Sequence, residues 1–204
     1  MTLSDYFEGE KLLKKYGISS IRSWYVDSAE EAVSKANGNP IVMKVITEKA
    51  LHKSKSGLVE LDLKTDKEIR SAFNSLSAKA AKLKPYKIIV QEMSKGGIEV
   101  IIGGKTDPQF GKVILLGLGG IYVEAFKDFA IRVCPIDKND ASSMIDNLKS
   151  ESVITYGSEN RKMLEGLLLK VSDMLTHTDL KELDLNPVIL RKDGYDVVDI
   201  RILK

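Results

Sequence analysis

The chain has 204 residues, a length that can bury a sizeable core and that suits one domain or two small lobes. Its 31 Lys and Arg residues nearly balance its 29 Asp and Glu residues, so the net charge of +2 gives no reason to expect a nucleic-acid or membrane partner. The single cysteine, Cys134, excludes an internal disulfide. Because the N-terminus is unlike a signal peptide and no apolar run could span a bilayer, we expect a soluble, cytoplasmic protein.

Helical and strand patterns then alternate along the chain. Three helices are predicted in the first part, one over 6–16 and two that begin at the capping-box pairs Ser28/Glu31 and Thr65/Glu68. Strands are predicted where β-branched residues gather, at 41–46, 58–63, 87–93, 98–102, 113–116 and 130–133. We expect 98–102 to pair with 87–93 across the Lys95-Gly-Gly97 turn.

Two helices, at 140–148 and 158–176, and a terminal hairpin complete the predicted elements. The hairpin joins 188–191 to 195–203 through Lys192-Asp-Gly194, a strong turn signal between alternating hydrophobic residues. The order of elements favours an α+β protein with mostly antiparallel pairing.

Lys44 lies midway through the predicted strand 41–46, among apolar neighbours. An edge strand could carry such a lysine to solvent. On a face that forms a site, the same ammonium group could contact nucleotide phosphates. The strand pattern does not distinguish these two interpretations.

The loop at 51–57 is rich in basic and small residues, which let backbone N–H groups and positive charge approach an anion. Its histidine, His52, is either an ordinary polar loop residue or a nucleophile, because neutral imidazole can accept a phosphoryl group near physiological pH. The other histidine, His177, ends a predicted helix, where a capping or solvated side chain is expected.

Three glycines in the stretch 117–120 directly follow a buried strand. Their cost in backbone entropy favours a ligand or a moving segment over a plain turn. Glu124, Asp128 and Arg132 come next at four-residue spacing. On a helix they would form a solvated charged face. At a site, the carboxylates could orient an imidazole and the arginine could hold phosphate.

Glu182, Asp184 and Asn186 alternate along an extended segment and therefore share one face. Asp199, on the return strand of the hairpin, can join them. Carboxylate and amide oxygens are ligands that Mg²⁺ prefers, usually with phosphates and water completing the octahedron. A polar outer face of a terminal hairpin would show the same pattern, so both interpretations stay open.

Taken in order, these motifs resemble the β subunit of ADP-forming acetyl-CoA synthetase, a relative of succinyl-CoA synthetase that carries an ATP-grasp domain. The resemblance runs from about Leu3 to Leu203. It rests on Ile41-Val-Met-Lys44, Leu51-His-Lys53, Val90-Gln-Glu-Met93, Glu99-Val-Ile101, Asp107-Pro-Gln-Phe-Gly111, Gly117-Leu-Gly-Gly120, Val123-Glu124, Lys127-Asp128 and Glu182-Leu-Asp-Leu-Asn-Pro187.

The resemblance implies an α+β ATP-grasp fold in which two lobes with mostly antiparallel sheets clamp the nucleotide. We expect one domain over 1–204, with a small lobe at about 18–90 and a large lobe at 91–204 that includes the N-terminal helix. Lys44 would contact phosphate, and the backbone of 90–93 would meet adenine. The full set of implied nucleotide-binding residues is Lys44, Lys53, Ser56, Gly57, Val90, Gln91, Glu92, Met93 and Glu99.

The resemblance also assigns metal-binding and catalytic residues. Asn186 and Asp199 match the metal-ligand pair, with Asp184 beside them. His52 matches a histidine that relays phosphate, and Glu124 resembles the carboxylate that steadies the phosphohistidine. Arg132 completes the expected catalytic set through its spacing from Glu124 and Asp128 and not through the resemblance.

The implied reaction is acyl-CoA + ADP + Pi ⇌ carboxylic acid + CoA + ATP, with ATP or ADP and Mg²⁺ as cofactors. No Gly-x-Gly-x-x-Gly pattern for CoA binding follows a strand, so we expect a CoA-binding α subunit as partner and an α2β2-type hetero-oligomer. Two other functions stay open: a non-catalytic ATP-binding regulatory module associated with an acyltransferase, and a stand-alone ATP-grasp ligase that joins a carboxylate to an amine.

Overall fold

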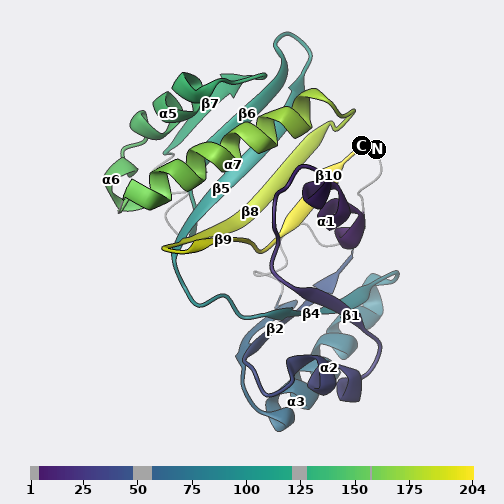
Figure 1. Cartoon of the computed structure of the whole chain (residues 1–204). Coiled ribbons are helices and arrows are strands. Elements are labelled where there is room, and N and C mark those ends of the chain that lie inside the picture. Colours follow the sequence, from purple (N-terminus) through teal and green to yellow (C-terminus); the bar gives the residue numbers. More distant parts are fainter. Residues whose placement is uncertain (1–4, 48–56, 121–127, 157) are drawn as a thin grey trace. The chain divides into compact units, whose positions relative to one another are not determined.

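The computed structural model describes residues 5–47, 57–120, 128–156 and 158–204, which form two compact units (Figure 1). The smaller unit is Ile21–Lys95, and the larger unit combines Met1–Ser20 with Gly96–Lys204. Each unit contains its own sheet and its own helices. That the units act as one nucleotide-clamping domain, with lobes at about 18–90 and 91–204, stays a prediction.

The smaller unit is built on a 4-stranded antiparallel sheet of order β1-β4-β2-β3. Both predicted helix starts are confirmed, since the Ser28 hydroxyl accepts a hydrogen bond from the Glu31 amide and Thr65 forms a capping box with Glu68. The elements are β1 (Ser23–Val26), α2 (Ala29–Ala36), β2 (Ile41–Ile46), β3 (Val59–Leu63), α3 (Asp66–Ala80), η1 (Ala81–Leu83) and β4 (Lys87–Glu92).

One face of this sheet packs against α2 and α3 to form the core of the smaller unit. Met43 and Val45 of β2 belong to this core together with Leu76 of α3. Because side chains alternate along a strand, Val42 and Lys44 point to the opposite face. The charged residue of β2 therefore lies on the face away from the helices.

The larger unit contains a 6-stranded sheet of order β10-β8-β5-β6-β7, with β9 pairing with β8. All strand pairs described in it are antiparallel, as predicted. Its elements are α1 (Tyr6–Lys15), β5 (Ile98–Asp107), β6 (Gly111–Leu118), β7 (Phe129–Val133), α5 (Lys138–Asp146), α6 (Glu151–Ile154), α7 (Ser158–Thr176), β8 (Glu182–Arg191), β9 (Gly194–Val197) and β10 (Ile200–Leu203).

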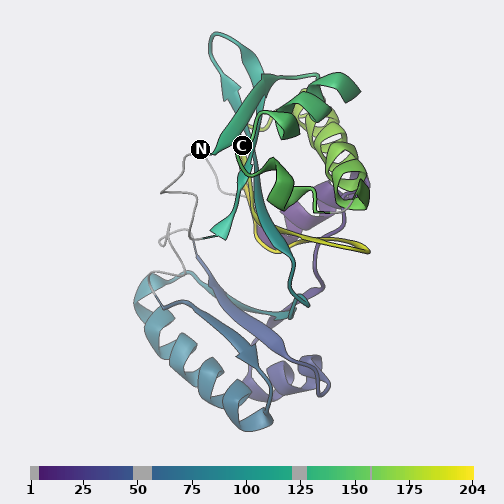
Figure 2. The ribbon, with the colours of Figure 1, turned by 90° about the vertical axis from the view of Figure 1, so that its left-hand side faces the viewer.

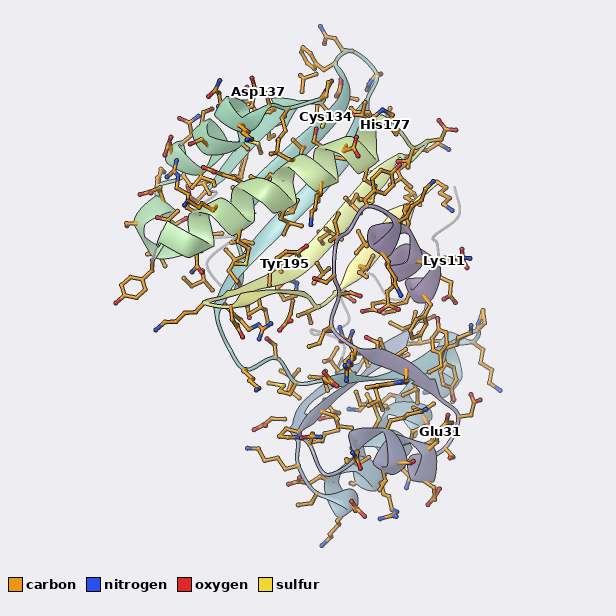
Figure 3. The ribbon with its side chains drawn as sticks, in the orientation of Figure 1. Lys11, Glu31, Cys134, Asp137, His177 and Tyr195 are labelled. Carbon is orange, nitrogen blue, oxygen red and sulfur yellow. The ribbon has the colours of Figure 1, made fainter. Side chains whose placement is uncertain are left out.

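Helices cover one face of the larger sheet (Figure 2). α7 contacts β6, β8 and β9, α5 contacts α7 and β7, and α1 contacts β10. Asp137 starts α5, where Figure 3 labels it, by accepting a hydrogen bond from the Asp140 amide at 2.8 Å. No helix within the described ranges is both long and apolar enough to cross a membrane.

The alternation of β5 distinguishes the two faces of the larger sheet. Val100 and Ile102 are fully buried on the face under the helices, and a Cβ on Gly104 would overlap the Leu175 side chain of α7. Glu99, Ile101 and Gly103 point to the other side. We call these the helix-covered face and the helix-free face; among the described helices, none packs on the second.

The predicted pairing of 98–102 with 87–93 is wrong. β4 lies between β1 and β2, so both of its edges are already paired, whereas β5 pairs with β6 and β8 in the other sheet. Gly96 and Gly97 have positive φ values of 88° and 154°, and a Cβ on Gly97 would overlap the Leu190 carbonyl. These glycines connect the two units instead of closing a hairpin.

The terminal hairpin is confirmed, but its return strand is divided. Val188 pairs with Val100 and Leu185 pairs with Ile102, so Asn186 and Pro187 both stand opposite Ile101. This bulge interrupts the pairing of β8. The residues of β8 before the bulge pair with β10, and the residues after it pair with β9. The bulge lies at the position where the sequence predicts a metal ligand.

Candidate functional site

In each unit, part of the predicted site lies on the sheet face away from the helices. In the smaller unit these residues are Lys44 and Gln91, which lie on neighbouring strands, whereas Val90 belongs to the core under the helices. In the larger unit they are Glu99, Asp184 and Asn186.

Lys44 lies in β2, a strand with neighbours on both sides, and the residue is 5% exposed. The interpretation of Lys44 as an edge-strand residue that reaches solvent is therefore wrong. Its neighbours in register are Ile89 and Val59, which are apolar. Burial removes this ammonium group from bulk water, so it would interact more strongly with an anionic ligand than an exposed lysine would.

The stretch 90–93 forms the end of β4 and the residue after it. Gln91 is fully buried, and its Nε2 donates to the Ser23 hydroxyl at 2.9 Å. The amides of Glu92 and Met93 donate to the carbonyls of Arg22 and Pro40 at 3.1 Å each. These two N–H groups are thus engaged within the chain, so adenine would have to meet other groups of this stretch.

Asp184, Asn186 and Asp199 come together on the helix-free side of β8 and its return strand. The backbone N–H of Asn186 donates to the backbone carbonyl of Asp199 at 3.3 Å, and the backbone N–H of Val198 donates to the carbonyl of Pro187 at 3.0 Å. Burial raises the pKa of the Asp184 carboxyl, and the nearby negative charge of Asp199 raises it further. Arg201, which is the register neighbour of Asp184 on β10, only partly offsets this effect.

This pair of carboxylates fits a hard divalent cation. Burial and the neighbouring Asp199 carboxylate raise the pKa of Asp184, so a bound cation would favour its ionised form, and all the candidate ligand atoms here are oxygens. The described residues contain no group of three or more His, Cys, Asp or Glu side chains that could hold a metal. Mg²⁺ at a nucleotide often takes only one or two carboxylates, with phosphate oxygens as further ligands, so this set is sufficient.

Glu99 lies on the same face, one step from the glycine stretch that follows β6. The Gly119 amide donates to the Glu99 carbonyl at 2.7 Å, and a Cβ on Gly119 would lie 2.8 Å from the Glu99 carbonyl carbon. Gly120 has a φ of +74° and passes beside the Glu99 carboxylate. The two segments of the chain cross so closely here that a side chain at Gly119 would overlap Glu99. The fold itself therefore requires these glycines.

Asp128 serves the fold on the helix-covered side. Its two carboxylate oxygens accept hydrogen bonds from the amides of Lys149 and Ser150, at 2.8 Å each, just before α6. Burial alone would raise the pKa of Asp128, but the hydrogen bonds from Ser150 and Lys149 together hold it below the usual range. Its carboxylate is therefore not available to orient an imidazole.

Arg132 also lies on the helix-covered face. It pairs in register with the buried Ile114, and its guanidinium donates to the Ser143 hydroxyl at 2.6 Å and to the Ile131 carbonyl at 2.8 Å. Residues 129–133 form a strand, so the helical interpretation of the four-residue spacing is wrong. The structure does not bring Arg132 to the face that carries Asp184.

Several predicted residues lie outside the described ranges: His52, Lys53, Ser56 and Glu124. Gly57, at the end of the first of these gaps, has a φ of +63°, and its carbonyl accepts a hydrogen bond from Lys79 Nζ at 3.0 Å. His177 is exposed at the end of α7 (Figure 3), with its Nδ1 3.0 Å from the Asp173 carboxylate. Its expected role as a helix-end residue agrees with this position.

Arg201 is the residue that sequence reasoning missed near the acidic pair. It stands opposite Asp184 in register, and its positive charge lowers the pKa of that carboxyl. The signal was present in the sequence, because Arg201 follows Asp199 by two positions and an extended segment places both on one face.

A profile of the ATP-grasp domain family matches residues 2–203. This chain belongs to the ATP-grasp family. Within that family it is 36% identical to the β subunit of acetate–CoA ligase [ADP-forming] I of Pyrococcus furiosus, over 96% of this chain and 89% of that subunit. It is 35% identical to 4-hydroxybutyrate–CoA ligase [ADP-forming] of Nitrosopumilus maritimus, but it spans only 30% of that longer protein.

Solved structures show the same arrangement as this ATP-grasp chain. The dinucleotide-forming acetyl-coenzyme A synthetase 1 of Ca. Korarchaeum cryptofilum, in complex with coenzyme A and Ca-AMPCP, matches 98% of this chain and 93% of that one with a TM-score of 0.90 and 32% identity. Another structure of the same protein, with Mg-AMPPCP and a phosphohistidine segment pointing towards the nucleotide binding site, matches with a TM-score of 0.82 and 32% identity over 98% of this chain and 92% of that one.

Proposed function

We propose that this chain is the nucleotide-binding subunit of an ADP-forming acyl-CoA synthetase. Such an enzyme converts acyl-CoA, ADP and phosphate into a carboxylic acid, CoA and ATP. The observation that carries the proposal is the match to a β subunit of nearly the same extent, at 36% identity over 96% of this chain and 89% of that subunit. We further propose that the CoA-binding chemistry lies on an α subunit and that the two polypeptides form a cytoplasmic hetero-oligomer of α2β2 type, because the matched relative is named as a β subunit.

Lys44 is proposed to contact the phosphates of ATP or ADP. Its burial on β2 supports this role, because an ammonium group in an apolar setting interacts more strongly with an anion than one in water does. Val90, Gln91, Glu92 and Met93 are proposed to line the nucleotide on the neighbouring strand, with Glu99 as a further contact from β5.

Asn186, Asp199 and Asp184 are proposed to hold Mg²⁺ through their oxygen atoms. The raised pKa of Asp184, caused by burial and by Asp199, supports this assignment, since bound cation would favour the ionised form. When bound, Mg²⁺ would neutralise charge on the phosphates and orient them for transfer. Arg201 limits the repulsion between the two carboxylates when no cation is present.

His52 is proposed to relay phosphate, with Glu124 steadying the phosphorylated imidazole. In the ATP-forming direction, the imidazole nitrogen carries a phosphoryl group that it received from the partner subunit. A β-phosphate oxygen of ADP attacks the phosphorus, the N–P bond breaks, and ATP forms while the imidazole regains its neutral form. A related enzyme has a phosphohistidine segment that points towards its nucleotide binding site, which supports a phosphohistidine step in the proposed reaction.

The test is covalent phosphorylation of the purified chain by ATP and Mg²⁺. We expect a phosphate that is labile in acid and stable in base, located on His52 by mass spectrometry, and lost in His52→Ala. His177→Ala is the matched control, because its exposed histidine lies at a helix end and should leave the label unchanged. A chain that binds ATP but never forms phosphohistidine would instead be a regulatory module or a carboxylate–amine ligase.

A further inference from the structure

The strands β6 and β7 carry an apolar surface on the helix-free face of the larger sheet. Phe129, Ile131 and Val133 alternate along β7 and are 53%, 47% and 51% exposed. Val113 and Leu115 of β6 stand beside Val133 and Ile131 in register. We call these five residues the β6–β7 surface.

This surface lacks the features that normally protect an exposed strand. Among the described residues, β7 pairs only with β6, so one of its edges is unpaired. Edge strands usually carry lysine, proline or another charge on an exposed face. Here the helix-free side of β7 is entirely apolar and includes an aromatic residue, which is typical of the centre of a protein interface.

The β6–β7 surface is continuous with the candidate metal site. One row of register neighbours crosses five strands in the order Arg201, Asp184, Gly103, Leu115 and Ile131. Ile131 is therefore three strand spacings from Asp184, which corresponds to about 14 Å. Because Gly103 has no side chain, nothing on β5 rises from the sheet between the acidic and the apolar parts of this row.

We infer that the β6–β7 surface docks the CoA-binding partner subunit. This inference rests on the proposed function, in which phosphate passes between the two subunits. Transfer of phosphate between the subunits through a single histidine favours a partner that lies close to the proposed nucleotide site, and Asp184 and Asn186 belong to that site on this face. An apolar surface on that same face, three strands away, provides a fixed attachment beside the site. A second copy of this chain has no such reason to bind there.

The experiment uses the complex purified from the native host through a tag on this chain. p-Benzoylphenylalanine replaces Ile131 in one variant and Leu61 in the control. Leu61 is also an apolar residue on an edge strand, and it is 63% exposed in the other sheet. After irradiation, the cross-linked product is identified by mass spectrometry. We expect position 131, but not position 61, to cross-link to the polypeptide that supports CoA-dependent turnover.

A second measurement uses charge to disrupt the interface. Ile131→Lys should weaken association with the partner by at least about thirtyfold, the effect of losing one central contact of roughly 2 kcal/mol, while Leu61→Lys leaves it unchanged. Nucleotide affinity of the isolated Ile131→Lys chain should stay normal, which shows that it folds. Cross-linking of position 131 to a second copy of this chain, or unchanged association of Ile131→Lys, would overturn the inference. Neither result affects the proposed function, which fails only if the complex shows no ADP-forming turnover.

Discussion

The two faces of the larger sheet differ in what their charged residues do. On the helix-covered face, Asp128 and Arg132 are satisfied by amides, a hydroxyl and a carbonyl of the chain itself. On the helix-free face, Asp184 and Asp199 repel each other, and the pKa of Asp184 is raised. The helices provide the core on one side, so the other side can keep charges that the fold does not need.

The smaller sheet follows the same division. Met43 and Val45 pack under α2 and α3, while Lys44 points away from them and is still buried. The charges predicted to bind ligands thus lie opposite the helices in both sheets, whereas the hydrogen-bonded Asp128 and Arg132 of the larger unit lie on the helix side. If this contrast is correct, substitutions on the helix-free faces change nucleotide chemistry and those on the helix-covered faces change folding.

The largest effect is expected from Asn186→Ala combined with Asp199→Ala. Loss of the proposed Mg²⁺ ligands should lower phosphohistidine formation by about a hundredfold to a thousandfold, because phosphate charge is no longer neutralised. Adenine nucleotide binding without metal should change little, as measured by calorimetry. Asp193→Ala, in the turn of the same hairpin, is the matched control. If the double variant kept the wild-type dependence on Mg²⁺, Asn186 and Asp199 would not be metal ligands but polar residues on the surface of the hairpin.

Lys44→Met should weaken ATP or ADP binding by roughly one to two decades. The substitution keeps the length and apolar stem of the side chain but removes a charge-assisted contact of about 1.5–3 kcal/mol. Lys87→Met, on the exposed end of β4, should leave the affinity unchanged. Titration calorimetry on the two folded variants compares them directly, and equal affinities would remove Lys44 from the site.

Asp128→Asn should destabilise the chain by about 2 kcal/mol without changing nucleotide affinity, because its carboxylate accepts two amide hydrogen bonds. The pKa of Asp128 is lowered in the folded state, so its ionised form stabilises the fold above the unfolded pKa of about 3.9. This contribution is lost as the pH falls through the folded pKa. Urea unfolding should therefore show a gap between wild type and variant at pH 7 that narrows in acid, and a constant gap would contradict the assignment.

The smallest effect is expected from Arg132→Met. Removing the bonds to Ser143 and Ile131 should cost about 1 kcal/mol of stability, while phosphohistidine formation stays within about twofold of wild type. Single-turnover kinetics provides the comparison. A hundredfold loss of transfer with normal ATP affinity would instead make Arg132 catalytic, as one interpretation of its spacing predicts, and would contradict the contrast between the faces.

Local patterns were enough to predict most elements. The strand 41–46 and the capping box at Thr65 and Glu68 depend on neighbouring residues only, and the structure confirms both. The pairing of 98–102 was wrong because β4 is enclosed by strands that are distant in sequence. The burial of Lys44 could not be predicted for the same reason. The strands on either side of it, β3 (59–63) and β4 (87–92), come later in the sequence.

The candidate site was predictable where strand alternation applies. Asp184 and Asn186 were placed on one face by their spacing, and the Asp-Gly turn brought Asp199 back to them. Arg132 lies in the strand predicted at 130–133, which the structure confirms, so the helical alternative for its four-residue spacing from Asp128 does not apply. Pro187 is a local signal for the bulge, because proline inside a sheet is found mainly at edges and bulges, but its pairing opposite Ile101 cannot be predicted from neighbouring residues.

The central claim is tested most directly by ATP formation. The purified complex of this chain with its CoA-binding partner is supplied with acetyl-CoA, ADP, phosphate and Mg²⁺, and ATP and free CoA are measured together. We expect equal amounts of both products, none without either polypeptide, and none with His52→Ala. A complex that binds nucleotide and CoA yet forms no ATP from any short acyl-CoA would contradict the proposed reaction.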